Sequence, residues 1–150
     1  MKFLNSGTIS RTLADASETV ACGETLGRAA APGGVIALIG NLGAGKTTLT
    51  QGIMAGLGYR EEVTSPTFSL VQEYHGGRLD VFHFDFYRME NEHELIELGW
   101  DDFLERGGLV IVEWPALFPQ LLPPNTQWLE LAHGNSGHGR TIRTIQAPQA

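Results

Sequence analysis

Eight consecutive residues combine glycine, lysine and threonine in a spacing that suits the binding of phosphate groups. They run from Gly40 to Thr47 in the order Gly-Asn-Leu-Gly-Ala-Gly-Lys-Thr and match the pattern G-x-x-x-x-G-K-[ST] at every required position. The glycines let the backbone curl so that several N–H groups point at phosphate oxygens. The lysine reaches the β- and γ-phosphates, and the threonine hydroxyl ligates Mg²⁺. The segment is therefore predicted to be a phosphate-binding loop, or P-loop.

The loop and the residue after it are predicted to contact the nucleotide. These contact residues are Asn41, Leu42, Gly43, Ala44, Gly45, Lys46, Thr47 and Thr48. Lys46 is also predicted to act in catalysis, and Thr47 to bind the metal. The alternative is a glycine-rich turn with a surface lysine. The choice of lysine argues against this alternative. Of the ten basic residues only Lys2 and Lys46 are lysines and the others are arginines, so an ordinary surface position in this chain would be expected to carry arginine.

Two carboxylates follow short apolar runs and are candidates to complete the site. Asp85 follows Val-Phe-His-Phe, and Glu113 follows Leu-Val-Ile-Val. A P-loop site needs a carboxylate near Mg²⁺, usually at the end of a buried strand. We predict that one of the two binds the metal, directly or through water, and that the other orients the attacking water. The sequence does not assign these roles, and either carboxylate could instead cap a strand at the sheet rim.

ATP is the preferred nucleotide. Regulatory GTPases read guanine with an N-K-x-D motif, and this chain has no Asn-Lys pair. The expected ligands are therefore ATP and Mg²⁺, with ADP as the product.

The loop lies between a predicted strand and a predicted helix, which is the context that the motif requires. Residues 35–39 are a short apolar run bounded by turn residues, typical of a strand buried on both faces of a parallel sheet. Residues 46–57 place apolar side chains at helical spacing and are followed by Gly58.

Other segments surround this strand–loop–helix unit. Helices are predicted over residues 17–31, with Ser17 as N-cap, 92–98 and 100–104. Strands are predicted over residues 7–13, as an edge strand, 67–74, 79–86, 109–112, 126–132 and 140–146. Together they predict an α/β fold: a single P-loop NTPase-like domain over residues 1–150, with 147–150 as a loose tail. Its mixed central sheet is flanked by helices, and antiparallel strands are added after the first βα unit.

The bulk composition limits the partners and the compartment. The chain has 150 residues, one cysteine and a formal net charge of −7. A nucleic-acid-binding domain is usually basic, so strong direct binding to nucleic acid is disfavoured. Cys22 cannot form an internal disulfide, which fits a reducing compartment. No apolar run has the length of a signal peptide core or a membrane span, so we expect a cytoplasmic protein with no membrane partner.

Four segments in order resemble one protein family. They are the loop from Gly40 to Thr48, Ser-Pro-Thr-Phe at 65–68, His-Phe-Asp-Phe-Tyr-Arg at 83–88, and Val-Glu-Trp-Pro at 112–115. This combination resembles the TsaE (YjeE) family, the ATPase component of bacterial tRNA threonylcarbamoyladenosine synthesis. The resemblance extends from about residue 17 to about residue 145.

The resemblance implies a role within a complex. Family members bind ATP, hydrolyse it slowly and bind the partner proteins TsaB and TsaD. TsaD transfers the threonylcarbamoyl group to tRNA, and the ATP cycle of TsaE is thought to reset the complex between turnovers. The chain would then meet tRNA only through the complex, which agrees with its acidic charge.

The resemblance also implies roles for single residues. Residues 64–67 would form a switch-like segment near the γ-phosphate, with Thr67 at the nucleotide, and Trp114 would lie at the nucleotide pocket or the partner face. Arg88 would contact phosphate or a partner. The alternatives are an ordinary turn at 65–67, a core tryptophan and a helix-cap or surface arginine. His83 is interpreted as a buried structural histidine rather than a catalytic base.

Three other functions remain open from the residues. A small-molecule kinase usually needs an arginine-bearing lid, and only Arg88 and Arg106 lie between the two carboxylates. A GTPase switch lacks its guanine motif here. A third possibility is a module that binds nucleotide without hydrolysing it.

Overall fold

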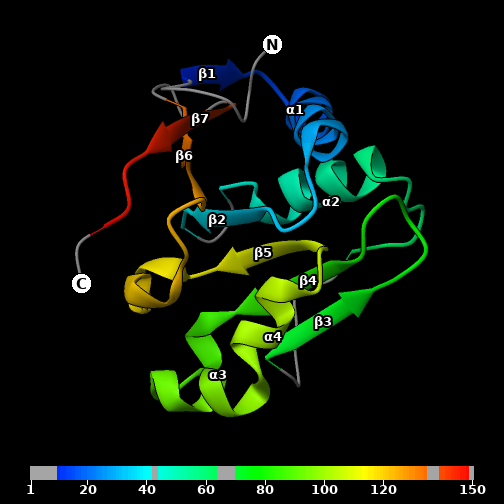
Figure 1. The fold of residues 1–150 in the computed structure, drawn as a ribbon. Coiled ribbons are helices and arrows are strands. Elements are labelled where there is room, and N and C mark those ends of the chain that lie inside the picture. Colours follow the sequence, from blue (N-terminus) through cyan, green and yellow to red (C-terminus); the bar gives the residue numbers. More distant parts are fainter. Residues whose placement is uncertain (1–9, 42–43, 64–69, 135–138, 149–150) are drawn as a thin grey trace.

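The computed structural model describes residues 10–41, 44–63, 70–134 and 139–148. They form a seven-stranded sheet with helices packed against it (Figure 1). The strands are β1 Ser10–Leu13, β2 Val35–Ile39, β3 Val71–Tyr74, β4 Val81–Asp85, β5 Leu109–Glu113, β6 Gln127–His133 and β7 Arg140–Ile145. The helices are α1 Ala16–Ala29, α2 Lys46–Gly56, α3 Glu92–Leu98 and α4 Trp100–Glu105, with 3₁₀ turns η1 Phe86–Arg88, η2 Pro115–Leu117 and η3 Pro119–Leu121.

The strand order is β1-β7-β6-β2-β5-β4-β3. The four central strands run parallel to one another, while β3 pairs antiparallel with β4 at one edge. At the other edge β7 pairs antiparallel with both β6 and β1. The predicted α/β fold with a mixed sheet is confirmed. The predicted strand over 67–74 is described only from its later part, because residues 64–69 lie outside the described ranges.

Alternation along β4 separates the chemistry of the sheet from its apolar packing. Phe82 and Phe84 belong to the buried cluster that includes residues of α3 and α4. Because neighbouring side chains in a strand point to opposite faces, His83 and Asp85 lie on the face covered by α1 and α2. Asp85 stands in register with Glu113 of β5, so these two carboxylates share that face.

The face toward α3 and α4 is held by edge-to-face aromatic contacts. The ring centroid of Phe84 lies 5.0 Å from that of Trp100 and 5.2 Å from that of Phe103. Phe86 lies 5.6 Å from Trp100. Pairs with this geometry add about 0.5–1.5 kcal/mol beyond the burial of their area. The short helix α4 is thus packed against the strand that carries Asp85 and the turn that follows it.

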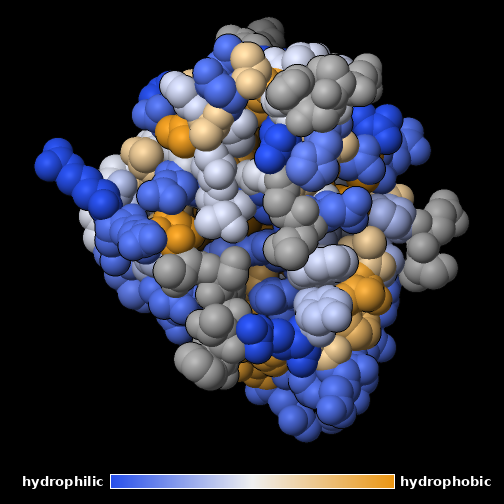
Figure 2. Space-filling view, turned by 180° about the vertical axis from the view of Figure 1, so that it is seen from behind, coloured by the Kyte–Doolittle hydropathy of each residue, from blue (hydrophilic) through white to orange (hydrophobic). Residues whose placement is uncertain are grey.

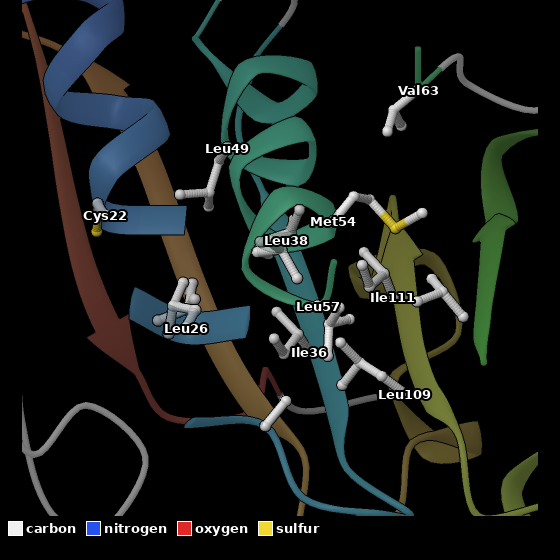
Figure 3. Packing of buried hydrophobic residues seen from close by; sticks show 14 of the residues in the cluster. Cys22, Leu26, Ile36, Leu38, Leu49, Met54, Leu57, Val63, Leu109 and Ile111 are labelled. Atoms are coloured by element: carbon white, nitrogen blue, oxygen red, sulfur yellow. The ribbon is translucent and has the colours of Figure 1, made fainter. Parts of the chain in front are cut away.

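The opposite face buries aliphatic side chains beneath α1 and α2. Figure 3 shows Leu26 of α1, Leu49 of α2, and Ile36 and Leu38 of β2 among the side chains of one buried cluster. All four side chains are at most 2% exposed. Burial of a leucine or isoleucine side chain contributes about 1.5–3 kcal/mol, so this layer fixes α2 on the sheet.

Helices α1 and α2 approach each other through glycines at matched spacing. These glycines are Gly23 and Gly27 on α1 and Gly52 and Gly56 on α2. A Cβ added at Gly52 would overlap the carbonyl oxygen of Val20, and one added at Gly23 would overlap that of Leu49. The two backbones are therefore in direct contact, which no side chain larger than hydrogen permits at these positions.

The C-terminal end of α1 is tied to the turn between β3 and β4. Arg78 in that turn donates from Nη2 to the carbonyl oxygen of Gly27 at 2.6 Å and to that of Ala30 at 3.0 Å. An arginine at the end of a helix satisfies carbonyl groups that have no partner within the helix.

The predicted N-cap of α1 was wrong by two residues. Asp15, not Ser17, is the N-cap, and its Oδ1 accepts from the N–H of Glu18 at 3.0 Å. Glu18 returns the contact by accepting from the N–H of Ala14 at 3.0 Å. This reciprocal pair resembles a capping box and satisfies two backbone donors, whereas Ser17 alone would satisfy one. The helix also ends at Ala29, before the predicted end at residue 31.

The surface is mainly hydrophilic on the face that Figure 2 shows, with hydrophobic residues in separate patches. Within the described ranges, no helix combines the length and the apolar character needed to cross a membrane.

The glycine contact between the helices generates a stability prediction. Gly52→Ala should lower the free energy of unfolding by about 1–2 kcal/mol, because overpacking costs roughly 1–3 kcal/mol and alanine's helix propensity returns at most about 1 kcal/mol. Denaturant unfolding of the purified variant measures the change. Gln51→Ala, at the neighbouring exposed position of α2, is the control and should change stability little. A Gly52→Ala protein that is more stable than the wild type would contradict the close approach.

Candidate functional site

The phosphate loop connects the end of β2 to the start of α2. Gly45, the N-cap of α2, has φ 104° and ψ 14°. This left-handed conformation strongly favours glycine, so the residue type follows from the turn. The first N–H groups and the positive dipole end of α2 lie at the loop, where they favour an anion. Leu42 and Gly43 lie outside the described ranges.

Lys46 begins α2 and turns its side chain toward the sheet. It is 9% exposed, and its Nζ lies 4.0 Å from Oε1 of Glu113. The same Nζ lies 4.6 Å from the centre of the Trp114 ring, a cation–π distance. A carboxylate and an aromatic face therefore hold the lysine next to the loop. The structure brings together three residues that were predicted separately from the sequence.

Glu113 ends β5 and is 6% exposed. It stands in register with Leu38 on one side and Asp85 on the other. Its Oε2 lies 2.7 Å from Nε2 of His83. Burying a carboxylate is costly unless a donor or a cation accompanies it, and His83 and Lys46 supply one of each. The histidine interpreted from the sequence as structural is thus a partner of the predicted acidic residue.

Asp85 ends β4 beside Glu113. Burial raises the pKa of Asp85, and the negative charge of Glu113 raises it further. The N–H of Tyr87, which donates to Oδ1 at 3.0 Å, lowers the pKa, as does the charge of Arg88. Arg88 lies 3.6 Å from Asp85 Oδ2 through its Nε. Burial and like charge together penalise the ionised form of Asp85, and a cation would relieve that penalty.

The donors beside the loop fit a magnesium ion. Mg²⁺ prefers oxygen ligands, and it is commonly held by one or two carboxylates together with phosphate oxygens and water. Asp85 and Glu113 supply carboxylates, and Thr47 supplies an exposed hydroxyl one residue after Lys46. The raised pKa of Asp85 next to Glu113 is the observation that favours a cation here.

Trp114 has an unusual backbone for its residue type. Its φ is +58°, and within the described ranges no other residue apart from glycine has a positive φ. The side chain is 39% exposed, so the interpretation of Trp114 as a core residue is wrong. Its ring lies 5.0 Å from the ring of Tyr87, which is 66% exposed. Strained backbone at a ligand site is a recurring feature of functional residues.

A cleft of about 420 Å³ opens beside the loop at the carboxyl ends of β2 and β5. Its lining includes Asn41, Ala44 and Lys46 from the loop region, residues 114–117 after β5, and residues 130–133 of β6. Ligands of open parallel sheets bind at this edge, outside the carboxyl ends of the strands. Four of the predicted nucleotide residues, Asn41, Ala44, Lys46 and Trp114, line this cleft, whereas Gly45, Thr47 and Thr48 are not part of its lining.

Arg140 is a residue at the site that the sequence analysis missed. A Cβ placed on Gly45 would lie 3.8 Å from Cγ of Arg140 and 3.9 Å from its Nε. Arg140 lines a second hollow, of about 130 Å³, together with Asp15 and Thr48. No local pattern links residue 140 to the loop, because only the packing of β7 beyond β6 brings it there.

Two predicted contacts lie apart from this group of residues, one because the structure does not describe it. Residues 64–67, the predicted switch-like segment with Thr67, lie outside the described ranges. Arg88 was left open between a phosphate contact and a surface role. Its side chain is 43% exposed and faces Asp85, so it belongs to the edge of the acidic pair.

These features define a class of protein. A P-loop between a central parallel strand and a helix, with an acidic residue ending the neighbouring strand, is the arrangement of a P-loop NTPase-like protein. The family model described as "Threonylcarbamoyl adenosine biosynthesis protein TsaE" matches residues 13–142. The chain belongs to the TsaE family.

Relatives and a solved structure agree with this assignment. A TsaE protein of Bacillus subtilis is 45% identical over 106 residues, which are 71% of this chain and 66% of the relative. The aligned region thus spans slightly less than two thirds of that relative. A TsaE protein of Treponema pallidum is 37% identical over 123 residues, 80% of this chain and 90% of the relative. The crystal structure of YdiB from Bacillus subtilis superposes with a TM-score of 0.77 at 31% identity, covering 95% of this chain and 87% of that one.

The raised pKa of Asp85 generates a prediction about pH. At neutral pH the ionised carboxylate carries the penalty of burial beside Glu113, and Asp85→Asn removes it. The variant should therefore have a higher free energy of unfolding than the wild type at about pH 7.5. The gain should shrink as the pH falls toward about 4, the ordinary aspartate pKa, because the native wild type then takes up the proton.

Denaturant unfolding across this pH range, without Mg²⁺, measures the effect. Asp102→Asn is the matched control: that carboxylate is 67% exposed and pairs with Arg106 at 2.7 Å. It should show no gain at neutral pH, since exposed pairs contribute little. An Asp85→Asn protein that loses stability at pH 7.5 would show that its pair with Arg88 outweighs the burial penalty.

Proposed function

We propose that this protein is a P-loop ATPase that binds Mg-ATP at residues 40–48, hydrolyses it slowly, and thereby supports turnover of the TsaB–TsaD complex in threonylcarbamoyladenosine modification of tRNA. The observation that carries the proposal is the approach of Lys46 Nζ to the buried Glu113 carboxylate, at 4.0 Å, beside the start of α2. Membership of the TsaE family supports the pathway. The transfer of the threonylcarbamoyl group is assigned to the partner, not to this chain.

Binding would rearrange one side chain at the site. The loop N–H groups and the start of α2 attract the phosphates, and Lys46 turns from Glu113 and Trp114 toward the β- and γ-phosphates. Thr47 and one of the carboxylates of Asp85 and Glu113 would hold Mg²⁺. When bound, the metal supplies positive charge to the phosphate oxygens. Asn41, Ala44 and Trp114, which line the cleft, would contact the nucleotide.

Hydrolysis would use the second carboxylate. It accepts a hydrogen bond from a water molecule and aims the water oxygen at the γ-phosphorus. A bond forms between that oxygen and phosphorus while the bond from phosphorus to the β–γ bridging oxygen breaks. ADP leaves with the bridging oxygen, and the water's proton passes to the carboxylate or to the phosphate formed. Lys46 and the loop N–H groups stabilise the charge that develops on the transferred group.

A partner would complete the catalytic set. Arg88 lies against Asp85, and Arg140, although it lies beside Gly45, donates from Nη1 to the carbonyl oxygen of Gly139 at 2.7 Å, so neither side chain is directed at the phosphates by these contacts. An arginine that stabilises the transition state can be supplied by a partner protein, with a large gain in rate. The net charge of −7 also favours a protein partner over direct contact with tRNA phosphates.

The role of Lys46 is tested by its removal. Lys46→Ala should lower the rate of ATP hydrolysis about 100-fold or more, because a charge that stabilises the transferred phosphoryl group is lost. Phosphate release from purified protein measures the rate, and Lys2→Ala, at the only other lysine in the sequence, is the control. Equal rates in Lys46→Ala and wild type would contradict the assignment of the loop.

The choice of base is tested separately. Unlabelled ATP and unlabelled GTP are compared as competitors for bound ATP, and we expect ATP to compete more strongly than GTP.

The pathway is tested by multi-turnover threonylcarbamoylation of tRNA. The reaction contains TsaB, TsaD and a supply of threonylcarbamoyl-adenylate, and it is run without this protein, with it, and with Lys46→Ala. Only the intact protein should sustain product beyond one round per complex. If product accumulates equally with Lys46→Ala, the ATP cycle does not drive turnover. If ATP is hydrolysed but no condition sustains turnover, the ATPase assignment stands and the pathway role fails.

The contact between Lys46 and Trp114 predicts an optical signal. Trp100 and Trp128 are 3% and 4% exposed, whereas Trp114 is 39% exposed and lies under the ammonium group. Saturating Mg-ATP should change tryptophan emission because Lys46 leaves the ring. Trp114→Phe should abolish the response, and Trp128→Phe should keep it. A response that survives in Trp114→Phe would place the nucleotide-linked change elsewhere.

A further inference from the structure

His83 is buried beside the site, and the proposed reaction does not yet use it. It lies in the middle of β4 and is 2% exposed. Its Nε2 lies 2.7 Å from Oε2 of Glu113, while Oε1 of the same carboxylate lies 4.0 Å from Nζ of Lys46. The two oxygens of Glu113 therefore have different partners. One oxygen faces β4, and the other faces the P-loop.

The geometry selects one tautomer of the ring. An ionised carboxylate only accepts hydrogen bonds, so Nε2 must be the donor in this contact. The other nitrogen, Nδ1, is buried and has no hydrogen-bond partner among the residues that the structure describes. A ring protonated only at Nδ1 would set two acceptors 2.7 Å apart and leave the N–H without a partner. The Nε2–H form avoids both costs.

We propose that His83 is a positioning residue for Glu113: its Nε2–H holds Oε2, so that Oε1 is presented to the loop, where the phosphates, the attacking water or Mg²⁺ would lie. The inference rests on the proposed ATPase function and assigns His83 no contact with the nucleotide. It also explains why a polar ring occupies a strand position between two buried phenylalanines, Phe82 and Phe84.

The positioning role matters most once Lys46 has moved. In the proposed cycle Lys46 leaves Glu113 for the phosphates, so the carboxylate loses its cation when its orientation is needed. The contact with His83 does not depend on Lys46, because it joins side chains of two neighbouring strands whose register is fixed by the sheet. Residues that orient a group at a reactive site through a hydrogen bond typically change activity about 10- to 100-fold when they are removed.

Three substitutions separate positioning from mere packing. In His83→Gln the side-chain amide can reach the place of Nε2 and keep a donor for Glu113. In His83→Asn the amide is too short to do so, and His83→Leu has no donor. His93→Leu is the matched control, because His93 on α3 makes a similar contact, 3.0 Å to Glu97, but is 73% exposed.

The measurement is steady-state ATP hydrolysis, with thermal unfolding of each variant and calorimetric binding of Mg-ADP. We expect kcat to fall about 10- to 100-fold in His83→Asn and His83→Leu and to recover in His83→Gln. KM for ATP and the Kd for Mg-ADP should stay within about threefold, since the contact acts on the reaction rather than on phosphate binding. His93→Leu should equal the wild type. With Glu113→Gln as background, removing His83 should lower kcat by less than about threefold, because the two act as one unit.

Two results would overturn the inference. One is a wild-type kcat in His83→Asn and His83→Leu. The other is a loss of kcat in all three variants, His83→Gln included, that follows their loss of thermal stability, since that pattern reports a structural role alone. A wild-type protein that neither binds nor hydrolyses ATP would instead overturn the proposed function.

A spectroscopic readout decides the contact without any nucleotide. Long-range ¹H–¹⁵N correlation spectra of the imidazole rings identify the protonated nitrogen of each histidine, and His83→Gln assigns the signal. We expect the proton of His83 on Nε2, with a signal that shifts in Glu113→Gln and not in Glu97→Gln. A proton found on Nδ1 with Nε2 bare would contradict the positioning contact, whatever the ATPase measurements give.

Discussion

The burial of the Glu113 carboxylate is the constraint on which the site depends. At 6% exposure this group needs a donor and a cation, because a desolvated charge without partners would destabilise the fold by several kcal/mol. His83 comes from β4, which flanks β5 on one side, and Lys46 comes from α2, which follows β2, the strand on the other side of β5. Neither partner is near Glu113 in sequence. The strand order that gives Glu113 its two partners is also the order that assembles the site. A chain that folds with this carboxylate correctly paired has therefore formed the site as well.

The same sheet divides its two faces between stability and chemistry. On β4 the phenylalanines pack against the aromatic residues of α3 and α4, and the alternate positions carry His83 and Asp85. A shift of β4 by one residue would bury a carboxylate among aromatic rings and turn a phenylalanine toward the loop. The aromatic contacts therefore fix the register that aligns Asp85 with Glu113. Packing on one face sets the position of charges on the other.

The parts of the fold with local signals could be predicted from the sequence. The apolar run of β2, the loop motif and the helical spacing of α2 each lie within a few residues, and all three were predicted. Strand order has no local signal, so the contact of His83 with Glu113 and the approach of Arg140 to Gly45 could not be predicted. The N-cap of α1 was misplaced because two capping residues lie close together and the better-paired one prevails. Trp114 was left open because a positive φ in a tryptophan cannot be read from residue type.

The glycine crossing of α1 and α2 has a mechanical consequence. Where the two backbones are in contact, no flexible side chains lie between them to absorb a displacement. The two helices are therefore expected to move as one rigid unit. One end of this unit adjoins the phosphate loop. At the opposite end, Arg78 in the turn between β3 and β4 donates hydrogen bonds to carbonyl groups at the end of α1. Any displacement of α2 would therefore carry α1 with it and, through Arg78, the turn between β3 and β4.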